Sequence, residues 1–226
     1  MKTHSKRYRE SEKQVDRAKN YSLKEAVATL KKMAPPKFEG SVDLHFSLNV
    51  DIKKSDQMVR GTVVLPHGTG KKIRVAVFCR GEHEKLARDA KADYVGAMDL
   101  IDKVSAGFLD FDCAIATPEM MKDLSKLGKV LGPRGLMPSP KTGTVTNDIT
   151  KAIEDVRKGK VEFRVDKQGG MHLSVGKISF NEDQICDNAT KVIDAVNEAK
   201  PATVKGKFVR SVFVVSSMNP GLRLSV

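Results

Sequence analysis

The segment Gly128–Thr144 has the composition of a loop that faces an anion. It holds four Gly, three Pro and three basic residues, and it contains no acid. Gly and Pro at this density interrupt both helices and strands, and so long a loop is usually either functional or disordered. Recurring apolar residues predict that it is pinned to a core, namely Leu131, Leu136, Met137 and Val145. The residues alone leave two interpretations open: an anion-facing loop, or a structural Ω-loop with ordinary solvated charges.

Neither Gly-rich segment carries a nucleotide-binding motif. At Gly68–Lys72, the first Gly of a P-loop would fall on Leu65, and the final Ser or Thr is replaced by Lys72. The phosphate cradle and the Mg²⁺ ligand are therefore both missing. The glycines of Gly128–Gly135 lack the GxGxxG spacing and follow a predicted helix rather than a strand. We therefore expect no nucleotide cofactor.

No catalytic or metal-binding arrangement is predicted either. The five histidines stand outside any HExxH or nucleophile motif, and the three cysteines are too far apart for a CxxC pair or a zinc site. Asp110 and Asp112 flank Phe111 and point to opposite faces if that segment is extended, so they do not form a paired-carboxylate site. The pattern does not favour an enzyme, and we expect no catalytic residue, no metal and no cofactor.

The charge balance indicates a polyanion as the partner. The 226 residues carry a formal net charge of +12, and a chain that is 40% hydrophobic and 30% charged is globular. No apolar run reaches the ~20 residues that cross a bilayer, and the N-terminus lacks the apolar centre of a signal peptide. We therefore expect a cytoplasmic protein that binds nucleic acid and no membrane. Two alternatives stay open: a membrane-surface module using the basic N-terminus, and a nucleotide-binding enzyme.

The two ends of the chain share one structural pattern. A capping box formed by Ser22 and Glu25 opens a helix that residues 34–36 should end. Strict alternation over 42–50 predicts a strand with one buried face, and His45 falls on its polar, solvated side. After residue 159 the pattern predicts two strands joined in a hairpin, an amphipathic helix and a last strand, at 160–165, 171–177, 183–199 and 205–217.

The middle of the chain alternates short apolar strands with helices. Such alternation implies βαβ units around a parallel sheet. Both ends are basic, whereas residues 81–123 are acidic. We therefore predict two domains of α+β and α/β class. Residues 1–66 with 160–226 form a discontinuous RNA-binding α+β domain of one sheet and two helices, and residues 67–159 form an inserted three-layer α/β domain.

Three segments of the discontinuous domain suit RNA. In the segment 36–41, Lys37 reaches phosphate, and Phe38 either stacks on a base or packs in the core. The predicted hairpin tip, Arg164–His172, contains two glycines that permit close approach of backbone to a ligand, although a plain turn explains them equally. In Arg210–Gly221, small hydroxyls suit phosphate and 2′-OH groups, and an edge strand with polar ends explains them as well.

Several motifs in a fixed order carry a family resemblance. They are LGKVLGPRGLMPSPKTGTV around the Gly/Pro loop, SDQMVRGTVVLPHGTGKKIRVAVF at 55–78, ADYVG at 92–96, DFDCAIATPEMM at 110–121, KGKVEFRVDKQGG at 158–170 and KGKFVRSVFVVSSMNPG at 205–221. Over nearly its whole length the chain resembles the bacterial large-subunit ribosomal protein L-one family (uL-one). The resemblance implies the same two domains, with a Rossmann-like inserted domain.

The resemblance also implies the partners. Proteins of this family bind large-subunit rRNA at the mobile stalk of the ribosome, take part in release of exit-site tRNA, and repress translation by binding their own operon mRNA. We expect a monomer when the chain is free.

The resemblance assigns RNA contacts to all three segments and to Glu25 on the first helix. At Asn219 the family commonly has Gly, which allows close approach of RNA, so this position departs from the pattern. Asn tolerates a left-handed backbone, so we keep it in the expected set. The expected rRNA-binding residues are Glu25, Lys37, Phe38, Ser41, Arg164, Asp166, Lys167, Gln168, His172, Ser211, Ser217, Met218 and Asn219.

Overall fold

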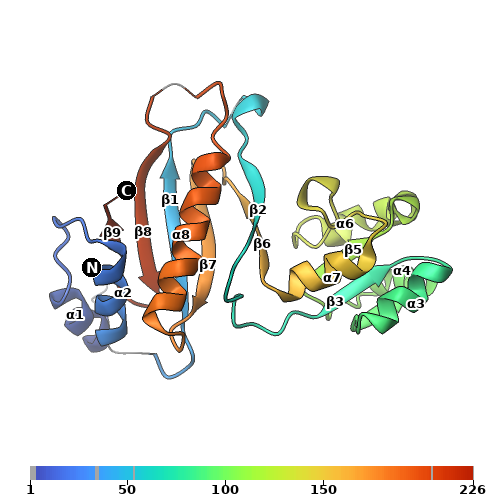
Figure 1. Cartoon of the computed structure of the whole chain (residues 1–226), viewed down its shortest axis with the longest axis horizontal. Helices are drawn as coiled ribbons and strands as arrows, with labels where there is room; N and C mark the ends of the chain where they lie inside the picture. The colour runs from blue at the N-terminus through green and yellow to red at the C-terminus, as the bar shows by residue number, and fades with distance from the viewer. Residues whose placement is uncertain (1–3, 34–35, 53, 205, 226) are drawn as a thin grey trace. The chain divides into compact units, whose positions relative to one another are not determined.

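The computed structural model describes residues 4–33, 36–52, 54–204 and 206–225. The chain divides into two compact units (Figure 1). The outer unit consists of Met1–Gly70 and Val161–Val226, and the inner unit is the continuous stretch Lys71–Lys160. Within the described ranges, no helix is both long and apolar enough to cross a bilayer.

A four-stranded antiparallel sheet forms the body of the outer unit. Every second side chain of its strand β1 is buried, as the alternation predicts, and β7 and β8 largely follow the same rhythm. Because β1 pairs with β7 on one side and with β8 on the other, strands from both ends of the chain are interleaved. The order is β7-β1-β8-β9, with β7 at Gly170–Lys177, β1 at Ser41–Leu48, β8 at Val209–Ser216 and β9 at Leu222–Leu224.

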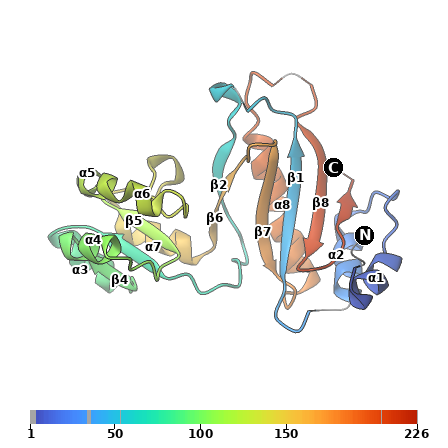
Figure 2. The same ribbon diagram turned by 180° about the vertical axis from the view of Figure 1, so that it is seen from behind.

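Two helices cover one face of this sheet. α2 (Leu23–Lys32) and α8 (Glu182–Glu198) pack against each other and against the strands. Figure 1 shows α8 in front of β7 and β1, and Figure 2 shows it behind them. Val27, Leu30 and Val192 are buried in the core that the helices and strands share. We call the opposite face, over which neither helix lies, the open face.

The start of α2 is as predicted. Ser22 Oγ accepts a hydrogen bond from the amide of Glu25, and the Glu25 carboxylate accepts one from the amide of Ser22, both at 3.4 Å. Residues 34–35, expected to help end this helix, lie outside the described residues, as does Lys205 at the start of the expected last strand. That strand, β8, begins at Val209.

The predicted hairpin is wrong in its pairing. β6 (Lys160–Arg164) pairs with β2 (Arg60–Val64) in a separate two-stranded sheet, whereas β7 pairs with β1. Gly61 permits this arrangement, because a Cβ at that position would lie 2.5 Å from Cζ of the buried Phe163. The turn between β6 and β7 therefore joins two sheets.

The inner unit is built around a three-stranded parallel sheet of order β4-β3-β5. Alternate residues of its strands enter two different hydrophobic clusters, so both faces of the sheet are covered. α4 contributes to one cluster, and α3 and α7 contribute to the other. The elements are β3 at Val75–Phe78, α3 at Glu82–Asp89, β4 at Tyr94–Gly96, α4 at Met98–Ser105, β5 at Cys113–Ala116 and α7 at Ile149–Arg157.

Short elements differ most from the sequence prediction. The expected helix at 118–127 is three consecutive turns, η2 (Pro118–Met120), α5 (Met121–Leu124) and η3 (Ser125–Leu127). The elements that the pattern misses are short and lack a regular run of apolar residues. Those that were not predicted are α1 at Lys6–Lys13, η1 at Ser55–Gln57, α6 at Gly128–Leu131, η4 at Pro140–Thr142, and β9.

Candidate nucleic-acid interface

The open face of the outer sheet is lined mainly by small polar side chains and rings. The strand register places them in three rows across β7, β1 and β8. Each row joins residues that lie far apart in the sequence. The rows are Gly170, Ser47 and Ser211; then His172, His45 and Phe213; then Ser174, Asp43 and Val215.

One end of this face carries two of the predicted segments. Ser217 Oγ accepts a hydrogen bond from the amide of Ser41 at 3.0 Å, which ties the end of β8 to the start of β1. Phe38 is 52% exposed, so its alternative placement in the core is wrong. Met218 is 65% exposed, and Lys37 is exposed beside Phe38. A cation, hydroxyls and two solvent-facing apolar side chains therefore gather at this end.

Asn219 is far less exposed than its neighbour Met218 in the expected set. Its side chain is buried, at 6% exposure, and it is satisfied by the protein itself. Its Nδ2 donates to Ser216 Oγ at 2.8 Å, and its Oδ1 accepts from Ser11 Oγ at 3.3 Å. The residue with left-handed backbone is Met218, at φ 63°, and not Asn219. The side chain of Asn219 is therefore committed to hydrogen bonds within the protein.

The opposite end of the face carries the turn between β6 and β7. Asp166 Oδ1 accepts hydrogen bonds from the amides of Gln168 and Gly170, each at 2.8 Å. These bonds, that from Gln168 first, lower the pKa of the Asp166 carboxyl. The carbonyl of Gly169 accepts from the amide of Leu48, which fixes the turn to the end of β1. The side chains at the tip, including that of Gln168, are left exposed.

The predicted segments thus lie at the two ends of β1. Ser41 and Ser47 are six residues apart, and at ~3.3 Å per residue they are ~20 Å apart along the strand. That span is comparable with the width of an RNA helix. Ser211 pairs with Ser47 near the far end. A ligand that contacts both ends must cross the middle of the open face.

The middle of the face brings the expected His172 beside two residues that the sequence analysis did not assign to RNA, His45 and Phe213. The Nδ1 atoms of His45 and His172 are 2.7 Å apart, so one ring donates to the other. His172 Nε2 also lies 3.6 Å from Asp166 Oδ2. Burial, followed by the neighbouring His172, lowers the pKa of His45, while Asp43 acts in the opposite direction. Strand alternation placed His45 on the polar side, but only the register brings it beside His172 and Phe213.

Two expected residues lie elsewhere. Glu25 is on α2, in the helix layer, where its carboxylate serves the capping box and lies 3.7 Å from Lys19 Nζ. Arg164 is exposed at the end of β6, in the two-stranded sheet. The structure does not bring either of them onto the open face.

The Gly128–Thr144 loop is ordered, as its apolar residues predict. Leu131 is buried, and Leu136 and Met137 pack against the same cluster of the inner unit. Hydroxyl groups brace its end, where Thr144 Oγ1 accepts from the amide of Ser139 at 2.8 Å. The basic side chains Lys129, Arg134 and Lys141 are exposed.

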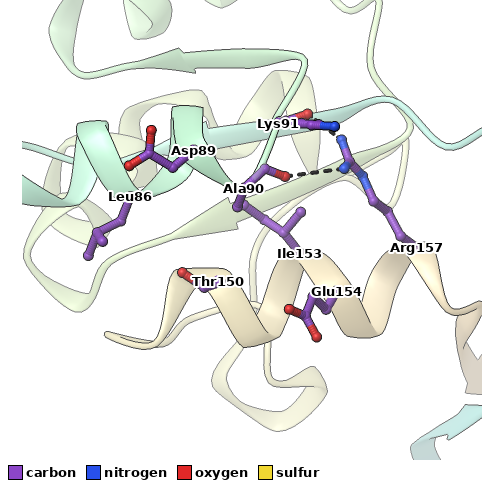
Figure 3. A pocket seen from close by; sticks show the side chains of 8 residues that line it. All are labelled: Leu86, Asp89, Ala90, Lys91, Thr150, Ile153, Glu154 and Arg157. Carbon is purple, nitrogen blue, oxygen red and sulfur yellow. Dashed lines mark hydrogen bonds between the residues drawn. The ribbon is translucent and has the colours of Figure 1, made fainter.

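The inner unit also holds an open cavity of about 490 Å³ between α3 and α7 (Figure 3). Its one guanidinium is occupied, because Arg157 donates to the backbone carbonyls of Ala90 and Lys91 at the end of α3. Across the described residues, no three His, Cys, Asp or Glu side chains are grouped to hold a metal ion. Burial raises the pKa of the Cys79 thiol to about 11, so it is a poor nucleophile.

Comparison with known proteins decides the family. The model of the ribosomal protein L1p/L10e family matches residues 30–220. The chain belongs to the ribosomal protein L1p/L10e family. It is 52% identical to the large ribosomal subunit protein uL1 of Thermosipho melanesiensis over 226 residues, which is 100% of this chain and 97% of the relative. The uL1 proteins of Fervidobacterium nodosum and Thermosipho africanus are 52% and 50% identical, over 100% and 99% of this chain and 97% of each relative.

Membership of the L1p/L10e family makes the chain a structural ribosomal protein and not an enzyme. Of the three segments of the candidate interface, 36–41 and 164–172 lie within the matched range of 30–220, and 210–221 ends one residue beyond it. α1 and Glu25 lie before it.

Proposed function

We propose that this chain binds large-subunit rRNA through the open face of its outer unit, as a structural protein of the large ribosomal subunit. One observation carries the proposal: hydroxyls and exposed lysines lie at both ends of one sheet face that α2 and α8 leave uncovered, and exposed apolar side chains lie at one of those ends. Membership of a ribosomal protein family favours rRNA over other polyanions.

The proposed mechanism is recognition of RNA shape. Lys37 and Lys167 contact phosphates and supply affinity that falls with salt. Ser211 and Ser217 offer hydroxyls to phosphates and 2′-OH groups, and the exposed Phe38 packs on a base or ribose. The face is held in shape before RNA arrives, because strands from both ends of the chain are paired and the turn at Asp166 is closed by its own carboxylate.

Family membership supports finer roles, which we propose with it. The rRNA site is at the mobile stalk near the tRNA exit site, and the chain takes part in release of exit-site tRNA. The same face binds the operon mRNA of the protein and represses its translation. We place the chain on the ribosome in the cytoplasm, as a monomer when free, and with an inserted Rossmann-like domain at 67–159. The parallel sheet covered on both faces supports that last assignment.

The test is a filter-binding titration with stalk-region fragments of large-subunit rRNA at several salt concentrations. Lys37→Ala and Lys167→Ala should each weaken binding and reduce the slope of log affinity against log salt by roughly one unit, as for one lost phosphate contact. Lys85→Ala removes the same charge from the exposed side of α3 in the inner unit and is the matched control. If both lysine variants keep the slope of the unaltered chain, these residues are not in the interface.

A further inference from the structure

The turn after β8 is held from outside by α1. The Arg7 guanidinium donates from Nη2 to the carbonyl of Met218 at 3.1 Å. One helical turn later, Ser11 donates from its hydroxyl to Asn219 Oδ1 at 3.3 Å. Ser11 is 1% exposed, so this second bond is shielded from water. Two residues of α1 therefore form hydrogen bonds with two successive residues near the end of the chain.

These two hydrogen bonds hold a backbone conformation that is unfavourable for a residue other than Gly. Met218 has φ 63°, a left-handed conformation that side chains other than Gly adopt only where their surroundings impose it. The same conformation leaves its side chain 65% exposed, at the end of the open face. Asn219 adds a second anchor, because its Nδ2 donates to Ser216 Oγ, and Ser216 is fully buried.

We propose that Ser11, Arg7 and Asn219 are positioning residues for RNA binding: they hold the turn so that Met218 presents its side chain to the RNA. This inference rests on the proposed function. The three residues need make no contact with RNA themselves, and the side chain of Asn219 is buried. When only part of a population is competent to bind, the apparent affinity falls by that fraction, so loosening the turn weakens binding without removing any contact.

The chemistry of each partner fits a positioning role. Ser11 and Asn219 are neutral, and their hydrogen bond is buried, so it is neither screened by salt nor available to phosphate. Arg7 is charged, but the donor it commits is engaged with a carbonyl of the protein. The turn that follows β8 is therefore held at every residue. Arg7 bonds to Met218, Ser11 bonds to Asn219, and Asn219 bonds to Ser216. Ser217 is tied to β1.

The experiment is a double-mutant cycle in full-length chains, with a stalk-region rRNA fragment as the probe. Ser11→Ala should weaken binding roughly five- to tenfold, as for loss of one buried hydrogen bond, and Asn219→Gly, which loses two, should weaken it at least as much. The slope of log affinity against log salt should stay that of the unaltered chain, because no phosphate contact is lost. In a Met218→Ala background, Ser11→Ala should cause almost no further loss, since there is no side chain left to position.

Arg7 is tested by two substitutions that separate charge from hydrogen bonding. Arg7→Gln keeps a donor for the Met218 carbonyl but no charge, and it should bind better than Arg7→Ala. Lys13→Ala removes an exposed charge from the last residue of α1 and should bind as the unaltered chain. If Ser11→Ala lowers the melting temperature appreciably, the Arg7 pair carries the same test.

Two results would overturn the inference. One is a Ser11→Ala chain that binds as tightly as the unaltered chain while Met218→Ala binds more weakly. The other is full additivity of Ser11→Ala and Met218→Ala, which would mean that α1 acts independently of Met218. If the unaltered chain shows no specific binding at all, the proposed function itself fails, and the inference with it.

Discussion

Replacing Ser217 by Ala tests whether the end of β8 serves both the fold and the RNA. In the structure, Ser217 Oγ accepts from the amide of Ser41 at 3.0 Å and lies 3.4 Å from its carbonyl oxygen. The substitution leaves that amide without its acceptor. We expect a loss of ~1 kcal/mol of stability, the net worth of one neutral hydrogen bond, and a fall in melting temperature of ~2–4 °C for a chain of this size.

The same hydroxyl is proposed to bond to RNA. Losing that bond, and the fixed position of the turn beside it, should lower affinity for the rRNA fragment about tenfold, or ~1.4 kcal/mol. Thermal unfolding followed by circular dichroism and a filter-binding titration measure the two effects separately. Ser217→Thr keeps the hydroxyl and is the control, with affinity close to that of the unaltered chain. A lower melting temperature with unchanged affinity would show that Ser217 is only structural, and would refute the reasoning.

Two further predictions follow from other parts of the outer unit. The folded state lowers the pKa of His45, so the unfolded chain takes up the proton first as the pH falls. The free energy of unfolding should therefore decrease as the pH drops through about 6.5. His45→Gln should make this pH dependence smaller, as measured by urea unfolding at about pH 7.5 and 5.5. Equal pH dependence in both chains would contradict this account of the His45–His172 pair. Gly61→Ala places a Cβ 2.5 Å from the Phe163 ring and should destabilise the chain by ~1–3 kcal/mol. Gly128→Ala is the control, because a Cβ there meets no atom within 4 Å. Equal stability of the two variants would contradict the packing argument.

The elements with strong local signals were predictable from the sequence. The capping box at Ser22 and Glu25 and the alternation of β1 depend on residues a few positions apart, and both are confirmed. The predicted hairpin failed because strand pairing depends on distant partners. The residues near β6 do not indicate that it pairs with β2. That pairing depends on Gly61, about 100 positions away in the sequence, which leaves space for the ring of Phe163.

The candidate site was predictable in its segments and not in its geometry. Lys37 and Met218 could be selected by type and by resemblance, and both are exposed. The role of Asn219 could not be foreseen, because its partner Ser11 lies 208 positions away, in a helix whose sequence, KRYRESEK, has no run of apolar residues. His45 was placed on the polar side of its strand, but its contact with His172 requires the register of β1 and β7.

The most direct test of the central claim is hydrogen–deuterium exchange with and without a stalk-region fragment of large-subunit rRNA. We predict that the RNA slows exchange in Lys37–Leu48, Asp166–Ser174 and Ser211–Met218, the segments that form the open face and its two ends. Exchange in α3 and α7 of the inner unit should be unchanged. Slowed exchange confined to the inner unit, for example to the basic Gly128–Thr144 loop, with none on the open face, would contradict the account.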